Sequence, residues 1–110
     1  ENNSFDAVLS VQVIHHARLK DIVFCIKEIE RVLKPNGVVF VTVTKNKMKG
    51  RATKVKIIEP RTYVMLDGPE KGVPHFIYTK TLVRKYFSNF KILSLYLDKS
   101  SHYCLLGKLK

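Results

Sequence analysis

The chain has 110 residues, the size of one small domain, and its usage of 45% hydrophobic and 26% charged residues excludes a disordered protein. Two cysteines exclude a disulfide-rich secreted scaffold, and no apolar run approaches the roughly 20 residues that a membrane-spanning helix needs. The net charge of +11 is unusually high and makes polyanions candidate partners.

The spacing of apolar residues in the first third of the chain predicts a strand followed by a helix. Residues 5–13 are nearly all apolar or small, which is typical of a parallel strand covered on both faces. From Asp21 to Leu33 the apolar residues recur at steps of three and four, which predicts an amphipathic helix. Asp21 is expected at the N-cap or in the first turn, and Pro35 with the following Asn-Gly pair ends the helix.

Residues 38–44 are rich in β-branched side chains and predict a second strand, so the order strand, helix, strand indicates a right-handed parallel crossover. Residues 45–78 read as a basic excursion with one or two short strands, broken by Pro60, Gly68, Pro69, Gly72 and Pro74. Excursions of this length inside a compact domain more often carry function than serve as filler.

The last third predicts a helix followed by a hairpin. Thr79 is expected to cap a helix that runs to about Asn89. Two strands follow at residues 90–97 and 102–109, and their short link suits an antiparallel hairpin. We therefore expect residues 1–110 to form a single α/β domain of β-α-β, an irregular excursion, and α-β-β with a terminal antiparallel hairpin.

Two motifs carry a family likeness. Residues 5–10 (FDAVLS) with 13–16 (VIHH) resemble the fourth strand and following loop of class I S-adenosylmethionine-dependent methyltransferases. Residues 28–37 (EIERVLKPNG) resemble the family's helix-to-strand junction, E-x-x-R-V-L-K-P-G-G, with Asn36 in place of the first glycine. Residues 74–79 and the closing HYCLL are similar to the tail of small-substrate members. The resemblance spans the whole chain and implies a partial Rossmann-like methyltransferase sheet.

Two parts of the family's cofactor site have no counterpart in the sequence. A complete member has a Gly-rich turn after its first strand and an acidic residue at the end of its second. The five glycines of this chain form no such turn. The resemblance thus implies the C-terminal half of a methyltransferase, which needs a missing half or a partner for activity. Its cofactor is S-adenosylmethionine, and we expect little or no binding by this chain alone.

The missing neighbour of the first strand has a structural consequence. In the family the fourth strand lies beside the first, so strand 5–13 becomes an apolar sheet edge that is not protected. We expect a second copy, another chain or the missing half to cover it. A truncated reading frame is a further interpretation of the same half-fold.

The resemblance also places candidate cofactor and catalytic residues. Ser10, Val11 and Gln12 are expected to contact the cofactor, because ligands of parallel sheets bind at the carboxyl ends of strands. His15 and His16 are candidates for orienting the methyl acceptor or serving as a base. The alternative is that both histidines only fill the turn between strand and helix.

The excursion holds the candidate acceptor-binding residues Tyr63, Glu70 and His75, which fall where the family's acceptor-binding lid lies. Loops carry binding residues disproportionately often, and ordinary loop polarity is the competing interpretation. The acceptor itself cannot be named from these residues.

The excess charge is concentrated in residues 45–56, which hold six basic and no acidic side chains. A solvated loop is one interpretation of this segment. The alternative function is a non-catalytic subunit that binds RNA or DNA through Lys45, Lys47, Lys49 and Arg51.

The cysteines do not indicate a metal site. Cys25 lies on the apolar face of the predicted helix, where it acts as a small hydrophobic side chain. His102 and Cys104 share a strand face, but no second pair has ligand spacing, so no metal is expected. Two unpaired cysteines suit a reducing cytoplasm.

Overall fold

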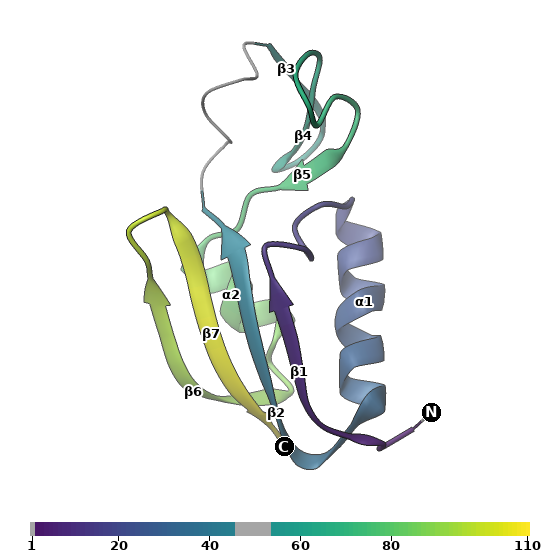
Figure 1. The fold of residues 1–110 in the computed structure, drawn as a ribbon, viewed down its shortest axis with the longest axis vertical. Helices are drawn as coiled ribbons and strands as arrows, with labels where there is room; N and C mark the ends of the chain where they lie inside the picture. The colour runs from purple at the N-terminus through teal and green to yellow at the C-terminus, as the bar shows by residue number, and fades with distance from the viewer. Residues whose placement is uncertain (1, 46–53) are drawn as a thin grey trace.

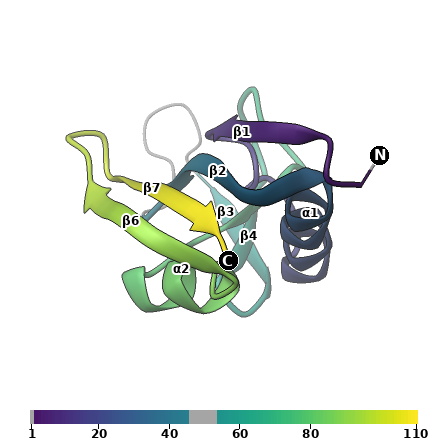
Figure 2. The ribbon, with the colours of Figure 1, turned by 90° about the horizontal axis from the view of Figure 1, so that it is seen from below.

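Four strands form the main sheet of the protein, whose computed structural model describes residues 2–45 and 54–110. The strand order is β1-β2-β7-β6, with β1 parallel to β2 and the other two pairs antiparallel. Both helices lie on the same side of this sheet (Figures 1 and 2). The elements are β1 (Phe5–Val11), α1 (Leu19–Val32), β2 (Leu33–Thr44), α2 (Lys80–Tyr86), β6 (Phe90–Leu97) and β7 (His102–Leu109). The α/β class and the terminal hairpin are confirmed.

The N-terminus of α1 is held by a residue that is distant in the sequence. The N-cap residue is Arg18, whose side chain makes no capping bond, and Asp21 lies in the first turn rather than at the cap. The Glu59 carboxylate takes the capping role instead: it accepts from the Leu19 N–H at 3.2 Å and pairs with the Arg18 guanidinium at 3.2 Å. An anion at this end also suits the helix dipole.

The end of α1 shows how the predicted turn is built. The helix ends at Val32, and β2 pairs with β1 at once, Leu33 opposite Phe5. The next pair is Val38 opposite Ala7, so four residues of β2 face a single residue of β1. Asn36 has a φ of 68° in this bulge, the left-handed region that a turn requires. The predicted turn thus lies inside the strand.

The excursion contains more regular structure than the sequence indicates. Three short strands, β3 (Val55–Glu59), β4 (Thr62–Met65) and β5 (Pro74–Phe76), form an antiparallel sheet in the order β3-β4-β5. This second sheet corrects the expectation of one or two strands. It lies beyond the carboxyl ends of β1 and β2 (Figure 1). Strands of three to five residues are too short for a side-chain alternation to be recognised.

The C-terminal elements follow the sequence closely. The Thr79 hydroxyl accepts from the Leu82 N–H at 3.1 Å, which confirms the predicted cap of α2. The helix ends at Tyr86, about three residues early, because the chain turns at Phe87 to enter β6. The hairpin strands have the predicted bounds, and the Asp98 carboxylate closes their turn by accepting two backbone N–H groups.

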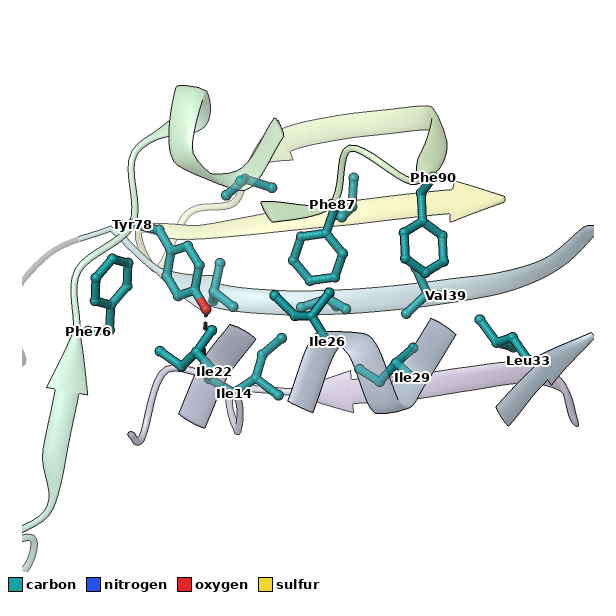
Figure 3. Close-up of a cluster of buried hydrophobic side chains, with 14 residues drawn as sticks. Ile14, Ile22, Ile26, Ile29, Leu33, Val39, Phe76, Tyr78, Phe87 and Phe90 are labelled. Atoms are coloured by element: carbon teal, nitrogen blue, oxygen red, sulfur yellow. Dashed lines mark hydrogen bonds between the residues drawn. The ribbon is translucent and has the colours of Figure 1, made fainter. Parts of the chain in front are cut away.

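The core lies between the main sheet and the helices (Figure 3). One face of α1 contributes isoleucines, β2 contributes alternate valines, and the α2–β6 region contributes aromatic rings. These buried residues include Ile22, Ile26, Ile29, Val39, Val41, Val43, Phe87 and Phe90. Neither described helix combines the length and the apolar character that crossing a membrane requires.

The opposite face of the main sheet is uncovered in the part of the chain that the structure describes (Figure 2). Val39 and Val41 point into the core, so Phe40 between them points to the other face. Leu9, Phe40 and Leu106 are register partners and share that face. Leu9 is 74% exposed. The expectation that β1 is covered on both faces is therefore wrong for these residues. The predicted edge position of β1 is confirmed.

We expect Glu59→Ala to lower the free energy of unfolding by about 1 kcal/mol, because it removes the carboxylate that accepts from the Leu19 N–H at the start of α1. Urea unfolding followed by circular dichroism measures this change. Glu28→Ala is the control, since Glu28 pairs with Arg31 on the exposed side of the same helix. An equal loss in both variants would contradict the capping role.

Candidate functional site

Three polar side chains from separate parts of the sequence meet near the carboxyl end of β1. His16 comes from the turn after β1, Glu70 from the loop between β4 and β5, and His75 from β5. The Glu70 Oε2 atom lies 2.9 Å from His75 Nε2 and 3.4 Å from His16 Nε2. The structure thus brings together His16, a catalytic candidate from the sequence, and Glu70 and His75, which the sequence placed among the acceptor-binding candidates.

The His75 ring is fixed on two sides. Its Nδ1 atom lies 2.9 Å from the Val73 carbonyl oxygen, which only accepts, so Nδ1 carries a proton and donates. This leaves Nε2 facing Glu70. The Tyr63 ring stacks on the His75 ring with centroids 5.3 Å apart. His75 is 2% exposed, so packing and hydrogen bonding together set its orientation.

Tyr63 was expected to bind the acceptor, and the structure leaves none of its side chain on the surface. The residue lies in β4, where its side chain is among the largest fully buried ones. Tyr63 therefore supports the ring of His75 by stacking on it and has no exposed surface that could contact a ligand.

The Glu70 loop is built by backbone hydrogen bonds. The Gly72 N–H donates to the Met65 carbonyl at 3.0 Å, and the Val73 N–H donates to the Glu70 carbonyl at 3.1 Å. Gly68 and Gly72 both have left-handed φ values, which favour glycine. These contacts hold the Glu70 carboxylate beside β5.

The two consecutive histidines have different surroundings. Burial lowers the pKa of His16, the nearby His75 lowers it further, and Glu70 opposes the change. Burial and the neighbouring histidines lower the pKa of His15 to about 3. Both rings are therefore neutral near pH 7. His16 remains partly exposed, whereas His15 is buried and lies outside the group that Glu70 joins.

The predicted cofactor residues Ser10, Val11 and Gln12 lie at the carboxyl end of β1. The Ser10 hydroxyl is buried and has no hydrogen-bond partner among residues 2–45 and 54–110. Gln12 ends the strand because its φ is 56°, and its N–H donates to the carbonyl and the hydroxyl of Thr42. This left-handed residue also explains why the strand stops at Val11 and not at Val13. The cofactor role of these residues stays a prediction.

Most of the basic segment cannot be compared with the structure. The Lys45 N–H donates to the Ser101 carbonyl at 3.0 Å. Lys47, Lys49 and Arg51 lie outside the described residues. The nucleic-acid interpretation of this segment therefore stays a prediction.

The cysteines lie away from the cluster of His16, Glu70 and His75. Cys25 packs at the margin of the core on α1, and Cys104 lies in the terminal hairpin near Asp98. Within the described ranges, the one group of three metal-ligand side chains is His16, Glu70 and His75. Its members are 54 and 5 residues apart, so no local spacing in the sequence indicates it.

Comparisons with known proteins bear on the fold of the chain. A family model described as a methyltransferase domain matches residues 1–41. A solved structure of a Pyrococcus horikoshii protein has 24% identity and a TM-score of 0.77, and the match covers 100% of this chain and 54% of that one. A SAM-dependent methyltransferase from Methanosarcina mazei has 17% identity and a TM-score of 0.77, over 98% and 60%.

The chain has the fold of part of a class I methyltransferase domain. A third similar structure, with 11% identity and a TM-score of 0.70, is a Burkholderia thailandensis 1,6-didemethyltoxoflavin-N1-methyltransferase with bound 1,6-didemethyltoxoflavin and S-adenosylhomocysteine. That match covers 100% of this chain and 46% of the other, so the chain spans about half the length of these methyltransferase-fold structures. A search of the curated proteins finds no significant match.

We expect Tyr78→Phe to lower the free energy of unfolding by about 1 kcal/mol. The Tyr78 hydroxyl donates to the buried Ile14 carbonyl at 3.2 Å, ahead of the two histidines (Figure 3). Chemical denaturation measures the loss. Tyr103→Phe, which removes a hydroxyl from a half-buried ring of β7, is the matched control. If both variants lose the same free energy, this hydrogen bond has no special part in stabilising the turn.

Proposed function

We propose that this chain is the acceptor-side portion of an S-adenosylmethionine-dependent methyltransferase that needs a missing half or a partner for activity. The observation that carries the proposal is the cluster of His16, Glu70 and His75 at the carboxyl end of β1, next to the second sheet. Ligands of sheets with parallel strands bind at that end. Within the methyltransferase fold, this position suits the binding of a methyl acceptor.

The exposed members of the cluster supply the polar contacts. His16 and Glu70 are each about one third exposed or less, while His75 is buried behind them. S-Adenosylmethionine, when bound, supplies a methyl group carried on a positively charged sulfur. His16 and Glu70 orient the acceptor, and the neutral imidazole of His16 is available to accept the proton that a hydroxyl or amine acceptor loses.

The chain offers one side of a cofactor site. Ser10 has a buried hydroxyl that lacks a partner in the described part of the chain, at the end of the strand where the cofactor's methionine portion is expected. Val11 and Gln12 continue that end. The Gly-rich turn and the acidic residue of the family have no counterpart in the 110 residues. This division supports a cofactor site that another segment must complete.

The uncovered face of the main sheet supports the same proposal. Phe5, Leu9 and Val11 are each more than half exposed on the edge strand. A contiguous apolar surface of this kind usually marks an interface. We propose that the missing half of the methyltransferase fold covers it; a second copy of this chain is the competing occupant.

We expect the 110-residue chain to bind S-adenosylmethionine or S-adenosylhomocysteine very weakly or not at all. Isothermal titration calorimetry on the purified chain measures this directly. The same titration on the full polypeptide encoded by the gene should show binding that Ser10→Val weakens. Tight binding by the 110 residues alone would contradict the incompleteness. No binding by a longer polypeptide that includes a Gly-rich turn would contradict the methyltransferase assignment.

If another segment covers the exposed face of the main sheet, a charge placed on that face should destabilise only the covered protein. Leu9→Lys should scarcely change the stability of the 110-residue chain, since the side chain is already 74% exposed. In a longer polypeptide that covers this face, it should cost about 2–5 kcal/mol, because it places a polar group in a buried apolar site.

Phe24→Lys is the matched control for this experiment, because Phe24 is similarly exposed, at 66%, but lies on α1, on the other side of the sheet. We expect it to leave both proteins nearly unchanged. Sedimentation of the wild-type chain separates the occupants: a dimer that Leu9→Lys dissociates would identify a second copy as the cover. A monomer whose β1 amides exchange freely with solvent would remove that alternative.

A further inference from the structure

We propose that His16, Glu70 and His75 form a binding site for a divalent transition-metal ion, with zinc the best match to the ligand set. Their nearest ligand atoms all lie within 4.8 Å of one another. Two imidazoles and one carboxylate are a ligand set of catalytic zinc sites, which keep a fourth position open. The same set also occurs in non-haem iron enzymes, so the identity of the ion is part of the test.

The observed distances suit a shared ion. Zinc binds histidine nitrogen and carboxylate oxygen at about 2.0–2.2 Å, so adjacent ligand atoms in a tetrahedron lie about 3.3–3.5 Å apart. Glu70 Oε2 lies 3.4 Å from His16 Nε2 and 2.9 Å from His75 Nε2. The His16 and His75 ligand atoms lie within 4.8 Å of each other, so a tetrahedral site requires the partly exposed His16 side chain to rotate toward His75.

The protonation of His75 points the same way. Because Nδ1 donates to the Val73 carbonyl, a neutral His75 has its lone pair on Nε2. That lone pair faces an acidic oxygen 2.9 Å away, which is an acceptor as well. Two acceptors at this distance repel unless a proton or a metal ion lies between them. A metal-bound histidine commonly donates its second ring nitrogen to a backbone carbonyl, as His75 does.

The site is preformed on one side and open on the other. Tyr63 stacks behind His75, and the backbone bonds of the 68–73 loop hold Glu70. His16 and Glu70 have side-chain exposures of 34% and 28%, which leaves a path for the ion and space for a further ligand. The three protein ligands carry one negative charge when both histidines are neutral, so a divalent ion retains a positive charge for that ligand.

The consequence for chemistry rests on the proposed function, whereas metal binding itself does not. An ion with an open position would bind a hydroxyl of the acceptor and lower its pKa. The hydroxyl proton would then pass to solvent, and His16 would serve as a ligand rather than as a base. The acceptor class indicated is a molecule with a metal-binding oxygen next to the methylation site.

The test uses the 110-residue chain without a histidine tag, after removal of metal with a chelator. Zn²⁺ is titrated against a chromophoric competitor, and Co²⁺ is added separately to report coordination through its visible absorption. We expect one Zn²⁺ per chain, an increase in melting temperature, and Co²⁺ bands of a four- or five-coordinate site. His16→Gln and Glu70→Gln should each weaken binding at least about tenfold.

His102→Gln is the control, because His102 lies in the terminal hairpin and pairs with Asp98. It should leave Zn²⁺ affinity unchanged. Absence of Zn²⁺ and Co²⁺ uptake by the wild-type chain would overturn the proposal, as would undiminished affinity in both cluster variants. If a variant fails to fold, the paramagnetic shifts of the His16 and His75 ring protons in the Co²⁺-loaded wild type decide the question.

These measurements need no S-adenosylmethionine. Metal uptake without cofactor binding in any longer polypeptide would therefore contradict the proposed function alone. Cofactor binding without metal uptake would contradict the metal site alone.

Discussion

Two hydrogen bonds join the turn after β1 to the segment around β5, and the arrangement of the site depends on them. The His15 carbonyl accepts from the Phe76 N–H at 2.7 Å, and the Ile14 carbonyl accepts from the Tyr78 hydroxyl at 3.2 Å. These groups lie in or beside the core, where an unpaired polar group is costly, so the bonds are strongly favoured. They bring two segments about 60 residues apart into one place. His16 and His75 face each other as a result, and Glu70 reaches both.

One face of the main sheet is not covered by any described part of the chain. Its helices cover one face, and the other face carries apolar side chains across β1, β2 and β7. The strand order places β1 at the edge, although its composition is that of an interior strand. The proposed cover of this face by a further segment would account for the disagreement between composition and position. The matches to about half of each similar methyltransferase-fold structure are consistent with this reading.

The sequence predicted those elements whose signals are local. The three- and four-residue period gave α1, Thr79 marked the start of α2, and the hairpin strands had their observed bounds. It did not predict that Glu59 caps α1, because that contact joins residues 40 apart. The second sheet was missed since its strands are short and separated by proline and glycine signals. The individual site residues were suspected by resemblance, but their convergence is a tertiary property that spacing does not encode.

The proposed acceptor side and the proposed cofactor side differ in how far the described residues supply their contacts. On the acceptor side, every residue of the cluster is supplied by the described part of the chain, and His75 is oriented by Val73 and Tyr63 from the same second sheet. On the cofactor side, Ser10 has a buried hydroxyl whose partner is not among these residues. A buried polar group without a partner requires an explanation, and for Ser10 the proposed function supplies one in a contact made by the cofactor or by another segment. Under the proposed function, the described residues hold the whole of the acceptor cluster, whereas the cofactor site would need a contact from another segment.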